Sequence, residues 1–263
     1  MKLIRHLSPD GPAHAVLQPD GTARAVAGDL FGDWRATDRV VQPGPLLAPV
    51  APTTIVCIGL NYAKHAAEGK RPPPDRPMWF MKLPGAVQHP GQPIRLPAVQ
   101  ASARVDYEAE LAFVLRKPAR NVARADALDH ILGFTCANDV SARDWQRDWG
   151  GGQWNHAKSF DTFCPLGPVL VTPDEVGDPN ALRIRSILNG TVMQDSTTAD
   201  MIFDVAALLE FLSADKTLPA GTLVLTGTPE GVGFARQPPV WLRPGDTISV
   251  EIERIGTLSN PVA

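Results

Sequence analysis

The sequence is poor in cysteine and lacks any long apolar run. Its 263 residues include three cysteines, which lie far apart without CxxC spacing: Cys57, Cys136 and Cys164. This pattern excludes a disulfide framework and a cysteine zinc site, and it predicts buried, reduced thiols. No apolar stretch approaches the roughly 18 residues of a membrane-spanning helix, and the chain reaches Ser8 and Pro9 too soon for the apolar core of a signal peptide. We therefore expect a cytoplasmic protein without a membrane segment.

The sequence also lacks a strong excess of charge of either sign. Lys and Arg number 25 against 28 Asp and Glu, a formal net charge of −3, which offers no general attraction for nucleic acid or anionic lipid. Hydrophobic residues make up 44% of the chain, which excludes a disordered protein. We expect a small-molecule ligand, and neither nucleic acid nor a membrane as partner.

Turn signals and alternating patterns predict a β-rich α+β fold. Pro-Asp-Gly turns at 9–11 and 19–21 indicate a small N-terminal β domain over 1–50, and the proline-rich run 41–50 is expected to connect it to a main domain over 51–263. Two helices are expected, a short one over 62–68 and an amphipathic one over 200–213. Strands are expected at 54–58, 106–115, 131–139, 223–226 and 248–252, with a hairpin in 181–194 around Asn189-Gly190.

Two carboxylates lie two residues apart in one predicted strand. Glu108 and Glu110 share a face with alanine and valine, the composition of an interior face. Two buried like charges are costly unless a cation lies between them, and Mg²⁺ and Mn²⁺ prefer carboxylate oxygens. Asp139, at the end of another apolar strand, is the candidate third ligand. The alternatives are a solvent-facing edge strand for the glutamates and, for Asp139, the N-cap of a helix that begins at Ser141.

A histidine and a glutamate lie three residues apart in the short predicted helix. His65 and Glu68 share one helix face, within hydrogen-bonding reach of each other. A carboxylate that holds one imidazole nitrogen raises the basicity of the ring and leaves the other nitrogen to take a proton from water. The alternative is an exposed ion pair. Further along the chain, Lys158 could enter a site from a loop, and a tight glycine-rich loop over 226–233 presents Thr228 without the residue order of a phosphate-binding loop.

Five segments together resemble the fumarylacetoacetate hydrolase family in residues, order and spacing: 59–68, 106–113, 133–144, 157–163 and 226–233. The resemblance covers the chain from about residue 52 onward. It implies a mixed β-sandwich roll preceded by a small N-terminal domain, and a homodimer. It also implies one Mg²⁺ or Mn²⁺ per subunit on Glu108, Glu110 and Asp139.

The same resemblance implies hydrolysis of an acylpyruvate, a 2-oxo acid with a second carbonyl, to pyruvate and a carboxylic acid. His65 and Glu68 would activate water. Four further positions match residues that hold the substrate or its developing oxyanion: Arg143, Gln146, Lys158 and Thr228. Alternatives within the family are an oxaloacetate decarboxylase and a 2-hydroxyhepta-2,4-diene-1,7-dioate isomerase. Outside it, we consider a non-catalytic metal-dependent binding protein and a glycosidase that uses Glu108 and Glu110.

Some positions depart from the family pattern. Gly85 stands where a hydroxyl residue is frequent, Met193 where a basic residue is common, and Asn155 with His156 where an arginine is frequent. These departures weaken the expectation of a dianionic substrate and favour a less basic distal pocket.

Overall fold

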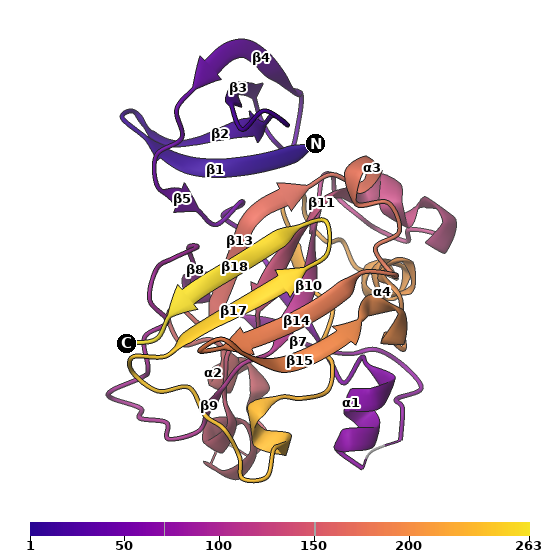
Figure 1. Ribbon diagram of the computed structural model, residues 1–263. Coiled ribbons are helices and arrows are strands. Elements are labelled where there is room, and N and C mark those ends of the chain that lie inside the picture. The colour runs from indigo at the N-terminus through magenta and orange to yellow at the C-terminus, as the bar shows by residue number, and fades with distance from the viewer. Residues whose placement is uncertain (71, 150) are drawn as a thin grey trace.

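Strands dominate the computed structural model, which describes residues 1–70, 72–149 and 151–263 (Figure 1). The strands are β1 (Lys2–Ser8), β2 (Gly11–Leu17), β3 (Ala23–Gly28), β4 (Trp34–Val41), β5 (Leu46–Leu47), β6 (Ile55–Gly59), β7 (Met78–Lys82), β8 (Val87–Gln88), β9 (Val105–Asp106), β10 (Ala109–Leu115), β11 (Ile131–Asn138), β12 (Ser141–Ala142), β13 (Cys164–Val171), β14 (Arg183–Leu188), β15 (Thr191–Thr197), β16 (Leu223–Leu225), β17 (Thr247–Ile252) and β18 (Gly256–Pro261).

Helices are few and short. The α-helices are α1 (Ala63–Glu68), α2 (Trp154–Lys158), α3 (Pro173–Val176) and α4 (Val205–Ser213). Among the described residues there are also four 3₁₀ helices and one π-helical turn: η1 (Pro84–Ala86), η2 (Arg124–His130), the π-helical η3 (Trp145–Trp149), η4 (Thr198–Asp200) and η5 (Gly233–Ala235). In the part of the chain that the structure describes, no helix is long and apolar enough to cross a membrane.

The largest sheet is mixed and has twelve strands in the order β4-β3-β2-β1-β13-β11-β10-β16-β6-β7, with β5 on β1 and β8 on β13. A four-stranded sheet, β15-β14-β17-β18, lies across its face (Figure 1). Residues from both sheets form one apolar cluster, in which Phe113 and Phe134 pack with Ile184 and Val250. The strand-rich α+β fold predicted from the sequence is confirmed.

Strand β10 is buried on both faces, which explains its nearly continuous apolar sequence. Its odd-numbered residues, such as Leu111 and Phe113, face the four-stranded sheet. Ala112 and Val114 belong to a second cluster on the opposite face. Glu110 has the parity of this second set, so the alternation of the strand directs its carboxylate away from the four-stranded sheet.

The N-terminal strands form an antiparallel array at the top of Figure 1 that continues the large sheet. The joint is made by β1, which pairs with β13 at Lys2↔Val171 and Leu3↔Leu170. The proline-rich run 41–50, expected to be irregular, contains the two-residue strand β5, which also pairs with β1. The hairpin predicted at Asn189-Gly190 is confirmed, with φ values of 50° and 81° at its two turn residues, as a type I′ turn requires.

Most predicted elements differ from the structure by one to three residues at their ends, and two differ more. The strand expected over 106–115 is interrupted, because Tyr107 and Glu108 lie between β9 and β10. The helix expected over 200–213 begins only at Val205, because the Asp204 side chain caps it by accepting from the Ala207 amide. Asp200 instead accepts from the Lys64 amide, which ties the preceding turn to α1.

The pairing directions bring four strand ends to one edge of the sheet. Strand β10 runs antiparallel to both β11 and β16, so its first residues lie beside the last residues of those strands. Strand β6 is parallel to β16 and ends at the same edge, where it leads into α1. The segments that carry the predicted site residues therefore converge although they lie far apart in the sequence.

Candidate active site

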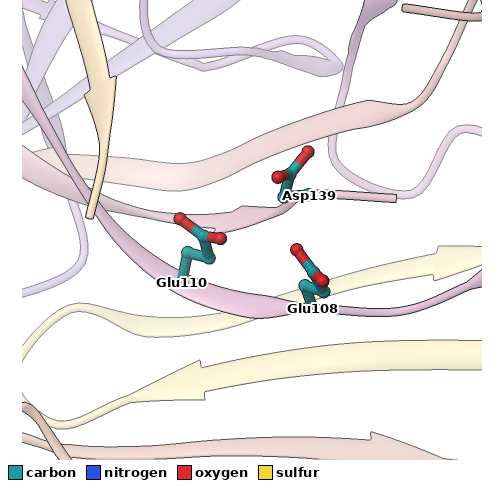
Figure 2. A group of neighbouring side chains, drawn as sticks. All are labelled: Glu108, Glu110 and Asp139. Carbon is teal, nitrogen blue, oxygen red and sulfur yellow. The ribbon is translucent and has the colours of Figure 1, made fainter. Parts of the chain in front are cut away.

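Three carboxylates meet at this edge of the sheet (Figure 2). In the antiparallel ladder of β10 and β11, Ala109 pairs with Asn138, and the Asp139 amide donates to the Glu108 carbonyl at 2.9 Å. Asp139 is therefore the neighbour of Glu108 across the strands, and Glu110 follows two residues later on the same face. One carboxylate oxygen from each of the three side chains lies within 4.8 Å of the others.

The triad is buried and partly neutralised by lysines. Glu108, Glu110 and Asp139 are 6%, 1% and 0% exposed. Lys158 Nζ donates to Glu108 Oε2 at 2.7 Å and also to Asp139 Oδ2. Lys82 Nζ, on β7, donates to the other oxygen of Asp139. Because β7 is the last strand of the sheet order, this contact indicates that the sheet curls round to enclose the site.

The two glutamates differ in their electrostatic surroundings. Burial, followed by the nearby Asp139 and Glu108 carboxylates, raises the pKa of Glu110 well above its usual value. The charge of Lys158 opposes this rise, and so does the Gly227 amide, which donates to Oε2 at 2.7 Å. Burial also opposes ionisation of Glu108, but Lys158 and Arg143 outweigh this effect and lower its pKa.

Arg143 donates hydrogen bonds to three side chains at the bottom of the site. Its guanidinium donates through Nη2 to Glu108 at 2.6 Å, through Nε to Asp106 at 2.9 Å and through Nη1 to Gln146 Oε1 at 2.9 Å. Asp106 is fully buried and also accepts from the amides of Gly233 and Phe234. These contacts hold the loop after Thr228 against the end of β9.

The donor set fits a hard divalent cation. The three carboxylates lie close enough together to bind one ion. They offer only oxygen atoms, the donors that Mg²⁺ and Mn²⁺ prefer. Burial and then repulsion from Asp139 and Glu108 raise the pKa of Glu110, and a cation among the three carboxylates would offset both effects. A solvent-facing edge strand, the alternative for the glutamates, is wrong because both are buried. The N-cap alternative for Asp139 is also wrong, because Ser141 begins the short strand β12.

His65 and Glu68 form a hydrogen-bonded pair on α1. His65 Nδ1 lies 3.0 Å from Glu68 Oε2, and His65 is only 8% exposed. The second Glu68 oxygen accepts from the Gly231 amide at 3.0 Å, which fixes the pair against the loop over 226–233. An ionised carboxylate can only accept, so Nδ1 carries the proton and Nε2 is the basic nitrogen. His65 is buried in this pair whereas Glu68 lies at the surface, so the pair lies at the boundary between the interior and solvent.

A cavity of about 490 Å³ joins the triad and the pair. It is lined by Ile58, Gly59, Leu60, His65, Gly69, Glu108, Glu110, Arg143, Gln146, Arg147, Gly152, Trp154, Thr228 and Phe234. Asp139 and Lys158 lie beneath it, in contact with Glu108. The structure thus brings all nine predicted site residues together. Lys158 reaches the site from the end of α2 rather than from a loop.

Two predicted substrate residues already have partners within the protein. The Thr228 hydroxyl donates to the Ala109 carbonyl at 2.9 Å and accepts from Gln194 Nε2 at 2.8 Å. Its single proton is therefore engaged, so Thr228 can accept from a ligand but not donate to it. Gln146 accepts from Arg143 through Oε1, which leaves its amide group for a ligand in the cavity.

Several residues of the site were not predicted from the sequence. Asp106 had a usable signal, because it precedes Glu108 by two residues and repeats the spacing of the glutamate pair. Lys82 ends a strand that is otherwise apolar on both faces, so the sequence does not show that the lysine faces inward. Gln194 and Phe234 have no comparable signal, since their roles depend on contacts between distant segments.

Comparison with known proteins identifies the family. The family model described as fumarylacetoacetate (FAA) hydrolase C-terminal matches residues 54–263, and the model described as Rv2993c-like, N-terminal matches residues 1–49. Protein Rv2993c of Mycobacterium tuberculosis is 45% identical over 271 residues, which cover 100% of this chain and 98% of that protein. The mitochondrial oxaloacetate tautomerase fahd2 of Xenopus laevis is 49% identical over 218 residues, which cover 82% of this chain and 68% of that protein.

A solved structure agrees with the sequence comparisons. The crystal structure of 5-carboxymethyl-2-hydroxymuconate delta-isomerase from Mycobacterium smegmatis is 42% identical to this chain, with a TM-score of 0.87. The match covers 100% of this chain and 99% of that one. The chain therefore belongs to the fumarylacetoacetate hydrolase family, a family of enzymes.

Proposed function

We propose that the protein catalyses keto–enol isomerisation of a small 2-oxo acid such as oxaloacetate, with Mg²⁺ or Mn²⁺ held by Glu108, Glu110 and Asp139. The observation that carries this proposal is that one cavity is lined both by carboxylates of the triad and by the His65 base. Bound to the triad, the cation would supply a Lewis acid with open positions for the oxygens of a 2-oxo acid.

His65 is the proposed base for proton transfer. From the keto form, its Nε2 would take a proton from the carbon next to the 2-oxo group, and the enolate oxygen would then take a proton to give the enol. In the reverse direction the enol loses its O–H proton and His65 returns a proton to that carbon. Glu68 holds Nδ1 at 3.0 Å and is itself held by the Gly231 amide, so the ring keeps one tautomer and one orientation. A positioned base of this kind contributes roughly 10² to 10⁴ in rate.

Three further residues are proposed to control the charge and the hydrogen bonding at the bottom of the cavity: Lys158, Arg143 and Gln146. Lys158 and Arg143 stabilise the ionised form of Glu108. Gln146 is oriented by Arg143, so its amide N–H groups are available to a carboxylate of the substrate. The proposed role of Thr228 is to accept a hydrogen bond from a protonated form of the substrate.

The hydrogen bonds of the site favour proton transfer over hydrolysis. Hydrolysis needs donors aimed at the oxyanion of a tetrahedral intermediate. The Thr228 hydroxyl donates to Ala109, and the Lys158 ammonium donates to Glu108 and Asp139. Proton transfer needs the His65 base beside the substrate and a Lewis acid for the enolate oxygen, which the cation would supply, but no donor aimed at a tetrahedral intermediate. The names of relatives, which include an oxaloacetate tautomerase and a hydroxymuconate isomerase, support the same choice.

A second candidate is the hydrolysis of an acylpyruvate to pyruvate and a carboxylic acid. The His65–Glu68 pair supports it, because the same nitrogen that takes a carbon-bound proton could take one from water. In this reaction water adds to the distal carbonyl, and the carbon–carbon bond then breaks to release the carboxylic acid and the enolate of pyruvate. Lys158 would have to turn one N–H toward the new oxyanion.

One set of assays separates the two reactions. Metal-stripped protein is mixed with enolic oxaloacetate or enolic acetylpyruvate, before and after addition of Mg²⁺ or Mn²⁺, and the ultraviolet absorbance of the enol is followed. Tautomerisation predicts metal-dependent loss of the oxaloacetate enol without release of pyruvate. Hydrolysis predicts that acetylpyruvate gives equal amounts of pyruvate and acetate, whereas decarboxylation predicts pyruvate and carbon dioxide from oxaloacetate. Absence of any metal-dependent change with either substrate would refute both proposals.

We also propose that the protein forms a homodimer, as the family resemblance implies. The edge strand β7 exposes three large apolar side chains, Met78, Trp79 and Met81, which a second copy of the chain would cover. Light scattering after size exclusion should give twice the chain mass, and Trp79→Asp should shift it toward the monomer. A wild-type monomer at micromolar concentration would refute the proposal.

A further inference from the structure

A second cavity, of about 470 Å³, lies where the N-terminal strands meet the rest of the chain. It shares no lining residue with the cavity of the candidate active site. Two basic side chains line it, Arg5 and His89, and the other lining residues are apolar or glycine: Leu7, Pro12, Leu47, Val50, Ala51, Pro52, Pro84, Gly85 and Val87. Among the residues that the structure describes, no acidic side chain lines this cavity. It therefore combines apolar walls with a positive charge.

The pairing of β1 places Arg5 in one wall of the cavity. Arg5 lies opposite His14 of β2 and, on the other side of the strand, opposite Leu47 of β5. Leu7 follows two residues later on the same face of β1 and lines the cavity as well. Figure 1 shows β5 next to β1, on the side where β8 lies. One wall therefore comes from the face of the N-terminal strands, and another comes from residues 84–89.

The charge of Arg5 is not neutralised within the described part of the chain. The side chain is half-buried, and no described carboxylate pairs with it. Its guanidinium donates to the Ala48 carbonyl at 3.5 Å, which is long for a hydrogen bond. Burial lowers the pKa of Arg5, and no nearby carboxylate counters this effect. A guanidinium has five N–H groups, so most of its donors are free to bind an anion in the cavity.

His89 offers a second donor to the same cavity. Its Nδ1 accepts from the Ala48 amide at 3.1 Å, so the proton of the neutral ring is on Nε2. Burial and then the charge of Arg5 lower the pKa of His89, which keeps the ring neutral near pH 7. Within the described ranges of the chain, this Nε2–H has no acceptor. His14 differs, because its Nε2 donates to the Pro49 carbonyl at 3.2 Å.

We propose that this cavity is a binding site for a monocarboxylate with an apolar body, such as the anion of a medium-chain fatty acid. The carboxylate would accept from Arg5 and from His89 Nε2. One positive charge matches a monoanion, and the paired N–H groups of a guanidinium match a carboxylate. The carbon chain would lie along the apolar walls, which include Leu7, Leu47 and Val87. The inference does not rest on the proposed function, because the two cavities share no lining residue.

The test is calorimetric binding to protein that has been stripped of metal and dialysed free of chelator. The candidate active site then keeps its three carboxylates without a cation, so it does not attract an anion. The probes are hexanoate, hexanamide, which has the same shape without the charge, and acetate, which has the charge without the chain. We expect hexanoate to bind at least about tenfold more tightly than either of the others, because only hexanoate satisfies both the cation and the apolar walls.

Three variants place the binding in this cavity. In Arg5→Gln, affinity for hexanoate should fall about ten- to a hundredfold, the effect of losing a hydrogen-bonded charge pair, whereas affinity for hexanamide should stay within about twofold. Arg24→Gln is the matched control, because Arg24 lies on β3 of the same array, pairs with Asp38 at 3.1 Å and does not line the cavity. Leu47→Trp keeps Arg5 and fills part of the apolar wall, so it should weaken hexanoate about tenfold or more and leave acetate unchanged.

Four results would overturn the proposal. The first is a wild type that does not bind hexanoate at millimolar concentration. The second is binding that both Arg5→Gln and Leu47→Trp leave unchanged, which would place the ligand elsewhere. The third is an equal loss in Arg5→Gln and Arg24→Gln, which would reduce the effect to general surface charge. The fourth is tighter binding of inorganic phosphate than of hexanoate, because a carboxylate with an apolar body would then be the wrong class of ligand.

Discussion

Glu110→Gln is expected to raise the free energy of unfolding of the metal-free protein and to reduce the stabilisation that a divalent cation gives. The Glu110 carboxylate is 1% exposed and lies beside Glu108 and Asp139. Burial and these two neighbours raise its pKa well above the usual 4.5. Glutamine keeps the shape of the side chain, and its carbonyl oxygen can still accept from the Gly227 amide. The substitution therefore removes the charge conflict and leaves the packing intact.

The sign follows from proton binding. Between about 4.5, the pKa in the unfolded chain, and the higher pKa in the folded protein, the folded state keeps a proton that the unfolded state has lost. As pH rises through this window, the free energy of unfolding of the metal-free protein falls by up to about 1.4 kcal/mol per pH unit. Glutamine cannot titrate, so the variant should lack this part of the slope. Asp106, whose pKa burial also raises, contributes equally to both proteins.

Urea unfolding in a chelator, at pH values from about 5 to about 8, measures this difference. The variant should become increasingly more stable than the wild type as pH rises. With Mg²⁺ at a hundred times its dissociation constant, the wild type should gain about 2.7 kcal/mol, and the variant, which lacks one ligand, should gain less. Glu210→Gln, an exposed position on α4, is the control. Parallel pH dependences for wild type and Glu110→Gln would refute the reasoning.

Three further predictions concern the base, the second lysine and the core. His65→Ala should lower the rate of enol loss by a factor of about 10² to 10⁴. The Mg²⁺ affinity measured by calorimetry should not change, because His65 is hydrogen-bonded to Glu68 and not to the triad. Loss of Mg²⁺ binding would contradict this assignment. Lys82→Met should cost about 3–5 kcal/mol in urea unfolding, since it leaves part of the Asp139 charge unpaired, and Mg²⁺ should restore part of that loss. Leu209→Ala, in the fully buried stripe of α4, should cost about 2–5 kcal/mol in the same assay, with unchanged activity per folded molecule.

Local patterns were sufficient to predict the strands that carry the site. The residues of β10 and β11 are apolar on both faces, and Asn189-Gly190 allows only a narrow set of turns, so these elements follow from short stretches of sequence. The bounds of α4 do not. Apolar residues continue the helical pattern before Val205, but Asn61 takes the amide of Phe203 through its side chain and ends the pattern there. A residue 142 positions away decides that boundary.

The residues of the candidate site could be predicted from the sequence only where they lie close together in it and follow the period of one strand or helix. Glu108 and Glu110 are linked by the period of a strand, but the register that places Asp139 beside Glu108 depends on pairing between separate segments. Lys82 was obscured because the residues before it in β7 are apolar on both faces: Trp79 and Met81 are exposed, whereas Phe80 and the lysine are buried. Hydrophobicity alone does not show which face of such a strand is buried.

The pairing between β1 and β13 is short, which limits how much of β13 would be uncovered if the N-terminal strands were removed. Along its outer edge, β13 is covered by β8 at Cys164 and Pro165 and by β1 at its last two residues. An uncovered strand edge invites other chains to add to the sheet, which leads to aggregation. Pro168 lies between the two covered stretches and has no amide hydrogen to offer an incoming strand. A chain without residues 1–49 would thus expose only a short, interrupted edge of β13. We therefore expect that such a chain would not add strands of other molecules to this edge of the sheet.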